Sequence, residues 1–159
     1  RIDGEFPNRP KMVVALVPHT SNIDFILTMG VLWGLGLRAS FLMKHSLFWF
    51  PLGQLLTAFG GIPVDRKSPQ GLVGQMAAEF ERRSRLVLGI TPEGTRSGVT
   101  EFKSGFARIA AAAKVPVLPA VLDYRTRTVR FAALIEDFTD VEGILARVRS
   151  EAALGMGRV

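Results

Sequence analysis

The sequence predicts an α/β fold, with one domain built on a mostly parallel β-sheet flanked by helices. Segments rich in β-branched residues alternate along the chain with segments of helical periodicity. Of the 159 residues, 48% are hydrophobic and 21% are charged, which suits a single packed core and argues against disorder. No repeat, low-complexity tract or long linker divides the chain. We therefore expect residues 1–159 to form one domain.

The first half of the chain contains three expected strands and two expected helices. Lys11–Val17 is a β-branched, apolar run typical of a buried strand. Ser21 is placed to open the helix that follows, and Pro51 suits the first turn of the next one. The remaining expected elements are helix Asn22–Leu37, strand Ala39–Lys44, helix Phe50–Phe59 and strand Ile62–Val64.

The second half of the chain continues the alternation of helices and strands. Pro69–Arg83 begins with proline and places its apolar residues on one face, as in an amphipathic helix. In active sites of parallel sheets, functional residues lie beyond the carboxyl ends of strands. The further expected elements are strand Arg85–Ile90, helix Ser104–Ala113, strands Val115–Asp123 and Thr128–Leu134, and helix Val141–Leu154.

Composition excludes several classes of site and of partner. The absence of cysteine excludes disulfides, a cysteine nucleophile and thiolate metal sites, and two histidines, His19 and His45, are too few for a His-rich metal cluster. The net charge of +6 suits an anionic partner such as nucleic acid, anionic lipid or a phosphorylated small molecule. The first ten residues lack the apolar region of a signal peptide. Since the chain lacks an initiator Met, we expect it to be trimmed or a fragment.

Two apolar stretches, Phe25–Leu37 and His45–Val64, bear on membrane contact. Phe25–Leu37 is uncharged, but its 13 residues are too few to cross a bilayer. His45–Val64 has 20 residues without a charge, but its prolines and glycines would leave backbone groups unpaired in hydrocarbon, so we expect no membrane span. Within it, Leu47–Phe50 is a cluster of three aromatic residues and one leucine. Such a cluster suits either the membrane interface or ordinary core packing.

A histidine and an aspartate stand just beyond the first expected strand. His19 and Asp24 are five residues apart across the turn into the next helix. A carboxylate against one imidazole nitrogen stabilises the imidazolium and leaves the other nitrogen as a general base. The pair thus suits activation of a hydroxyl, either of a substrate or of water. Alternatively, Ser21 and Asp24 form a helix-capping box and His19 is an ordinary loop residue.

A second polar cluster, Thr91–Ser97, follows the strand that ends at Ile90. Gly94 permits a close approach of the backbone, and Arg96 offers a bidentate fork for phosphate or carboxylate. The alternative is an ordinary turn with a solvated arginine.

A third cluster, Gly60–Arg66, ends in two consecutive cations, Arg66 and Lys67. Together with Arg96 and Lys103, they are suited to surround a phosphate group. The alternative is a solvated, charged loop.

Four segments, in order, resemble the motifs of the glycerophospholipid acyltransferase family, whose best-known members are 1-acylglycerol-3-phosphate acyltransferases. PHTSNIDF (Pro18–Phe25) resembles its His-x4-Asp motif, GGIPVDR (Gly60–Arg66) its second motif, and TPEGTRS (Thr91–Ser97) its Glu-Gly-Thr-Arg motif. The stretch Glu101–Leu122 is similar to the family's Lys-x-Gly segment, helix and Val-Pro-rich fourth motif. The resemblance covers Lys11–Leu122 and implies an acyltransferase-like fold with its motif-bearing core at 11–122.

The resemblance implies an O-acyltransferase of phospholipid biosynthesis. It would move a fatty acyl group from acyl-CoA or acyl carrier protein to the hydroxyl of a phosphate-containing lysolipid such as 1-acylglycerol-3-phosphate. His19 would be the general base, and Asp24 would orient and polarise it. Since the thioester is already activated, no metal and no cofactor are implied. The remaining site residues would be Arg66, Glu93, Gly94, Thr95, Arg96 and Lys44 for the acceptor phosphate, and Lys103, Pro116 and Pro119 for the acyl donor or for structure.

The motifs alone do not specify the acceptor or the cellular location. The glutamate that the family usually has near Lys44 is not seen here, which leaves another lysophospholipid, a lyso-ornithine lipid, a glycerophosphodiester or a small soluble alcohol open as acceptors. The positive charge favours peripheral binding to an anionic leaflet, on the cytoplasmic side of the membrane.

Two rival functions remain open. A non-catalytic membrane- or phosphate-binding module accounts for the charge but leaves His19 and Asp24 without a role. A hydrolase would use the same pair on water. We expect no nucleic acid partner, because the basic residues are scattered and no nucleic-acid-binding motif is present.

Overall fold

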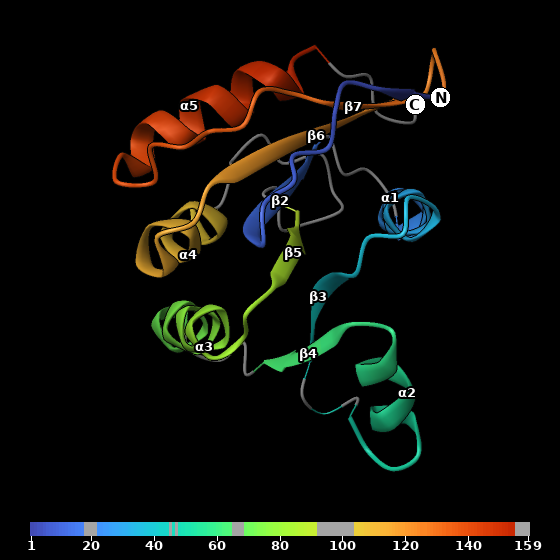
Figure 1. Cartoon of the computed structure of the whole chain (residues 1–159), viewed down its shortest axis with the longest axis vertical. Helices are drawn as coiled ribbons and strands as arrows, with labels where there is room; N and C mark the ends of the chain where they lie inside the picture. The colour runs from blue at the N-terminus through green and yellow to red at the C-terminus, as the bar shows by residue number, and fades with distance from the viewer. Residues whose placement is uncertain (18–21, 45, 47, 65–68, 92–103, 155–159) are drawn as a thin grey trace.

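A seven-stranded sheet forms the centre of the structure, a computed structural model (Figure 1). The structure describes residues 1–17, 22–44, 46, 48–64, 69–91 and 104–154. The strands are β1 (Ile2–Asp3), β2 (Lys11–Val17), β3 (Ala39–Lys44), β4 (Gly61–Val64), β5 (Leu86–Ile90), β6 (Val117–Asp123) and β7 (Thr128–Phe131). The helices are α1 (Asn22–Gly34), α2 (Leu52–Ala58), α3 (Pro69–Arg82), α4 (Gly105–Ala113) and α5 (Val141–Ala152).

The sheet is mostly parallel, in the order β1-β7-β6-β2-β5-β3-β4. The five strands from β6 to β4 run parallel to their neighbours. Strand β7 is antiparallel to β6, to which it is joined by a tight turn, and β1 adds parallel to β7. The predicted α/β class with a mostly parallel sheet is confirmed.

Helices cover both faces of this sheet and form two core clusters. Helices α3, α4 and α5 lie on one face, to the left in Figure 1, and α1 lies on the other. Along β2, Val13 and Val17 point into the first cluster, while Val14 and Leu16 point into the second. A strand buried on both faces must be apolar at every position, which explains the unbroken run in the sequence. The largest helix side chains buried on the first face are Met76, Phe80, Phe106, Ile109 and Ile144.

Helix α1 ends at Gly34, three residues before its predicted end. Gly36 has a φ of 76°, in the left-handed region. The Gly36 N–H donates to the Trp33 carbonyl, and the Leu37 N–H donates to the Leu32 carbonyl, both over 2.9 Å. This is the glycine-based helix ending that satisfies the last carbonyl groups. Because the apolar pattern continues beyond Gly36, the prediction placed the end of this helix three residues too late.

Strand β7 ends at Phe131 rather than at the predicted Leu134, because the next residue, Ala132, lies opposite Pro119 of β6. The Ala132 N–H donates to the Pro119 carbonyl over 2.9 Å, but Pro119 has no N–H to return a bond. Pairing resumes only at the isolated bridge between Val117 and Ile135. The sequence reading also missed the two-residue strand β1. The other predicted elements agree with the structure to within two residues at each end.

The aromatic cluster before α2 is largely exposed. Trp49 and Phe50 are 58% and 79% exposed, while Phe48 is half-buried and Leu47 lies outside the described residues. Core packing, one of the two readings of this cluster, is therefore wrong for Trp49 and Phe50. Among the helices that the structure describes, none has the length and apolar character needed to cross a bilayer.

Candidate active site

The carboxyl ends of four neighbouring parallel strands lie along one edge of the sheet, in the order β2, β5, β3 and β4 (Figure 1). In the sequence, His19 is the second residue after β2, Glu93 is the third after β5 and Arg66 is the second after β4. Lys44 is the last residue of β3. The strand ends that lead into the motifs therefore share this edge, which we call the carboxyl edge.

Strand register sets how far apart these strand ends are. The pairs that fix the register are Ala15 with Ile90, Phe41 with Gly89, and Lys44 with Val64. It follows that Val17, Lys44 and Val64 lie at the same height along the strand direction. With strands about 4.8 Å apart, Val17 lies roughly 10 Å from Lys44 and roughly 14 Å from Val64. These strand ends are close enough for the segments that follow them to serve one ligand.

Three helices begin at the same edge. Helices α1, α3 and α4 follow β2, β4 and β5 in the chain, so their amino ends lie near the carboxyl edge and they run back across the sheet. The amino end of a helix carries a partial positive charge and free N–H groups. The fold thus directs favourable electrostatic potential toward an anionic group at this edge, such as a phosphate or a developing oxyanion.

Most side chains expected to carry the chemistry lie outside the described residues. Asp24 is the third residue of α1 and Lys44 ends β3, but the structure does not describe either side chain. The roles given to all of these residues stay predictions. The predicted site residues outside the described ranges are His19, Arg66, Glu93, Gly94, Thr95, Arg96 and Lys103.

The two prolines of the fourth motif are described, and they lie away from the carboxyl edge. The Pro116 carbonyl accepts a hydrogen bond from the Val13 N–H over 3.0 Å, near the amino end of β6. It stands five residues before Val121, the partner of Val17, which is about 16 Å along the strand. Pro119 pairs with Ala15 and is buried in the middle of the sheet. Their expected acyl-donor role stays a prediction, while Pro119 has the structural effect on β7 described above.

Asp123 ends β6, which lies on the other side of β2 from β5, β3 and β4. Its Oδ1 accepts hydrogen bonds from the N–H groups of Arg125, over 2.9 Å, and Thr126, over 3.4 Å. Slight desolvation works to raise the pKa of Asp123, but hydrogen bonds from Thr126 and Arg125 and the Arg125 charge outweigh it, so the pKa is below its usual range. Asp123 therefore stabilises its own turn and is a poor candidate for a general base.

A hollow of about 1240 Å³ lies at the opposite, amino edge of the sheet. The sequence analysis did not predict this hollow, although the positions of three arginines could have indicated it. Arg9, Arg38 and Arg85 each stand one or two residues before the start of a strand, so parallel pairing collects them at one edge.

Comparison with known proteins decides the family. A family model described as Acyltransferase matches residues 3–123, about three quarters of the chain. The chain belongs to the acyltransferase family. This confirms the resemblance carried by the four motifs, all of which fall within or overlap the matched region.

Several curated relatives are similar to this acyltransferase-family chain over most of its length. It is 32% identical over 118 residues to a 1-acyl-sn-glycerol-3-phosphate acyltransferase of Limnanthes alba, which covers 70% of this chain and 41% of the relative. It is 27% identical over 136 residues to the protein of the same name from Escherichia coli K12, covering 81% of this chain and 54% of that protein. The chain thus spans about half the length of these relatives.

A solved structure has the same fold. The 1-acyl-sn-glycerophosphate (LPA) acyltransferase PlsC of Thermotoga maritima aligns with 99% of this chain and 73% of its own, with a TM-score of 0.56 and 20% sequence identity. At this identity the likeness supports the arrangement of sheet and helices. It adds nothing about substrate.

Proposed function

We propose that this chain transfers a fatty acyl group from an acyl thioester to the hydroxyl of a phosphate-containing lysolipid such as 1-acylglycerol-3-phosphate. One observation carries the proposal: in a chain of the acyltransferase family, the strands that lead to His19, Glu93 and Arg66 all end at the carboxyl edge. The names of the curated relatives agree with this acceptor.

In the proposed reaction, His19 removes the proton from the acceptor hydroxyl while Asp24 stabilises the imidazolium. The hydroxyl oxygen attacks the thioester carbonyl and forms a tetrahedral intermediate. The carbon–sulfur bond then breaks, the ester forms, and the thiolate takes the proton from His19. N–H groups at the amino end of a helix are suited to stabilise the oxyanion.

The acceptor phosphate is assigned to Arg66, to the segment Glu93–Arg96 and to Lys44, because guanidinium and ammonium groups bind phosphate with strong, charge-assisted hydrogen bonds. Lys103 is assigned to the acyl donor, which is either acyl-CoA or acyl carrier protein. The donor is a co-substrate, and the proposed reaction uses no metal and no cofactor.

We also propose that the protein binds the membrane peripherally, on the cytoplasmic side, where its acceptor resides. The exposure of Trp49 and Phe50 supports this, because aromatic rings are favoured at the membrane interface. The net charge of +6 adds attraction to anionic lipids.

The test is thiol release from palmitoyl-CoA, with and without lysophosphatidic acid. Acceptor-dependent release is expected for the wild type and for His45→Ala, the matched control, and should be absent in His19→Ala. Release that does not need the acceptor would indicate a hydrolase instead. If neither palmitoyl-CoA nor palmitoyl carrier protein gives acceptor-dependent release with any of the acceptors named above, the proposed function is wrong.

A further inference from the structure

The hollow at the amino edge is formed where four segments of the chain return to the sheet, and we call it the amino-edge groove. Its volume is about 1240 Å³. The lining residues lie within Phe6–Pro10, Trp33–Ser40, Thr57–Gly60 and Arg83–Val87. These segments lead into β2, β3, β4 and β5, so the groove lies at the edge opposite the strand ends that lead to His19, Arg66 and Glu93.

The lining of the groove is strongly cationic. It includes Arg9, Arg38, Arg83 and Arg85, and no aspartate or glutamate. Arg9 is ion-paired with Glu136. Two of the four arginines, Arg38 and Arg85, make no hydrogen bond or ion pair with their side chains in the part of the chain that the structure describes.

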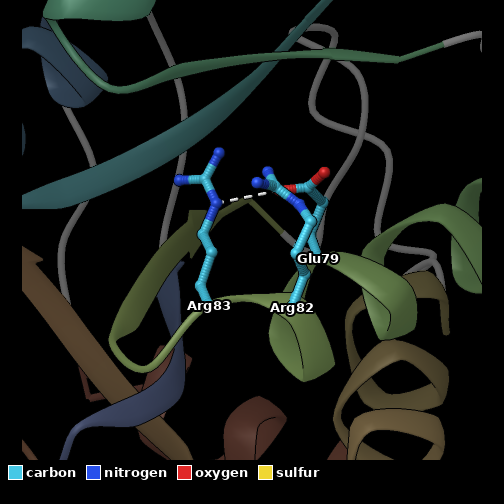
Figure 2. Close-up of polar contacts among 3 residues, drawn as sticks. All are labelled: Glu79, Arg82 and Arg83. Atoms are coloured by element: carbon cyan, nitrogen blue, oxygen red, sulfur yellow. Dashed lines mark hydrogen bonds and ion pairs between the residues drawn. The ribbon is translucent and has the colours of Figure 1, made fainter.

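Arg83 is held by a carboxylate on α3 (Figure 2). Its Nε lies 2.8 Å from Glu79 Oε2, and Arg82 Nη2 lies 2.7 Å from the same oxygen. Burial works to raise the pKa of Glu79, but the Arg82 hydrogen bond and the charges of both arginines outweigh it and hold the pKa below its usual range. Glu79 is therefore committed to Arg82 and Arg83, and no carboxylate in the described ranges is paired with Arg38 or Arg85.

Arg38 and Arg85 are neighbours in the sheet. Ala39 pairs with Val87, so Arg38 and Arg85 stand at the starts of adjacent strands. Both arginines line the groove, so an anion bound there would be attracted by both positive charges. Guanidinium groups bind phosphate oxygens in particular, through paired N–H donors.

Exposed apolar side chains border the same groove. Trp33, Leu35 and Phe59 line it and are 43%, 46% and 51% exposed. The Trp33 and Phe59 rings contact each other, with centroids 5.8 Å apart, and so join α1 to α2. Aromatic rings beside arginines are typical of protein at the interface of an anionic membrane. A phosphate linked to apolar chains matches this lining better than a free phosphate does.

The apolar surface continues from the groove along α2. Thr57 lines both the groove and a second hollow, of about 450 Å³, that includes Phe48 and Phe50. Helices α1 and α2 both lead from the carboxyl ends of strands to the amino ends of strands. A bilayer lying against α1 and α2 would therefore reach the groove at one end and the carboxyl edge at the other.

We propose that the amino-edge groove is a second, non-catalytic site that binds the phosphate headgroup of an anionic phospholipid in the membrane. Arg38 and Arg85 hold the phosphate, and Trp33, Leu35 and Phe59 contact the apolar part of the lipid. The proposal rests on the proposed function, because it would keep a lipid-modifying enzyme on the anionic surface that holds its acceptor.

The test measures binding to phosphatidylcholine vesicles with and without phosphatidylglycerol. Trp49→Phe leaves Trp33 as the only tryptophan, since the chain has two. Its fluorescence should shift to the blue on vesicles that contain phosphatidylglycerol. In that background, Arg38→Gln with Arg85→Gln should weaken binding about thirty-fold, the effect of two arginines near an anionic surface. A thirty-fold change in affinity corresponds to about 2 kcal/mol, at 1.4 kcal/mol for each tenfold change.

The matched control is Arg125→Gln with Arg147→Gln, which removes the same charge at exposed positions away from the groove. At constant ionic strength it should weaken vesicle binding far less than Arg38→Gln with Arg85→Gln does. Equal loss in both double variants would mean diffuse electrostatic attraction and would overturn the proposal. So would the absence of a Trp33 shift, or no loss in Arg38→Gln with Arg85→Gln, provided that thermal unfolding shows each variant to be folded.

Glycerol 3-phosphate distinguishes a lipid from a soluble phosphate ester. A saturable Trp33 response to glycerol 3-phosphate that requires Arg38 and Arg85 would replace the lipid with a soluble ligand. Failure of the proposed function is measured separately: His19→Ala should bind vesicles like the wild type, and Arg38→Gln with Arg85→Gln should keep full turnover in neutral detergent micelles.

Discussion

Gly60 is held in a conformation and a space that suit glycine alone, and we predict that Gly60→Ala destabilises the protein strongly. Its φ is 95°, and a Cβ at this position would lie 2.5 Å from the carbonyl oxygen of Ala39. The Gly60 carbonyl also accepts a hydrogen bond of 3.0 Å from the Phe41 N–H, where β3 and β4 begin to pair. Because the obstructing atom is backbone, the clash can be relieved only by moving β4 away from β3.

The expected loss is the sum of three terms. A left-handed backbone costs a residue with a Cβ about 1–2 kcal/mol. Steric overpacking costs roughly 1–3 kcal/mol more. Replacing glycine by alanine restricts the unfolded chain and returns about 0.4–1 kcal/mol. The net decrease in the free energy of unfolding is therefore about 1–4.5 kcal/mol.

Urea denaturation followed by tryptophan fluorescence measures this loss. Gly74→Ala is the control, because Gly74 is an exposed position in α3 where an added Cβ meets nothing within 4 Å. The control should stabilise the protein by about 0.5–1 kcal/mol. Gly60→Ala should also raise the KM for the acceptor, since β4 leads to Arg66. A Gly60→Ala protein within about 0.5 kcal/mol of the wild type, the usual range of a neutral surface change, would refute the reasoning.

Three further predictions concern α3, α5 and the exposed aromatic cluster. Glu79→Gln should lower the free energy of unfolding by about 0.5–1 kcal/mol at neutral pH. Since the folded pKa of Glu79 lies below its ordinary value of 4.5, this difference should be present above pH 4.5, shrink as the pH falls through the folded pKa, and be absent in acid denaturation below it. Asp140→Ala should cost about 1 kcal/mol in thermal unfolding, because Asp140 caps α5 through a 3.0 Å hydrogen bond; Asp140→Asn should restore most of it. Trp49→Ser with Phe50→Ser should weaken co-sedimentation with anionic vesicles at least about tenfold and leave the melting temperature unchanged, because neither ring is in the core; unchanged co-sedimentation would argue against membrane contact there.

Local pattern was enough to predict most elements, and the errors have identifiable physical causes. Lys11–Val17 was predicted with its observed bounds, because a strand buried on both faces requires an unbroken apolar run. The end of α1 was misplaced because Gly36 ends the helix inside a continuing apolar pattern. Strand β1 exists only through pairing of Ile2 with Val129, 127 positions away, which no local pattern reveals.

The candidate site was predictable from its motifs, but its layout was not. The sequence indicates that His19, Arg66 and Arg96 follow strands. It does not indicate that β5 lies between β2 and β3, or that β4 lies at the end of the sheet, because strand order depends on how the helices pack across both faces. The amino-edge groove was missed for the same reason, since Arg38 and Arg85 become neighbours only when β3 and β5 pair.

Pro63 has a consequence for how copies of this protein meet in solution. It lies in β4, the last strand of the sheet, and its side chain is exposed. The Gly60 carbonyl points toward β3, because it accepts a hydrogen bond from the Phe41 N–H. Backbone groups of alternate residues point to opposite sides of a strand, so the backbone groups of Pro63 point away from β3, toward the outer side. A proline there offers no N–H to an approaching strand, and the other outer strand, β1, has only two residues. Both borders of the sheet that the structure describes therefore resist strand-by-strand addition of a second chain. This protects the protein from aggregation when copies come close together, as they would on the membrane surface proposed above.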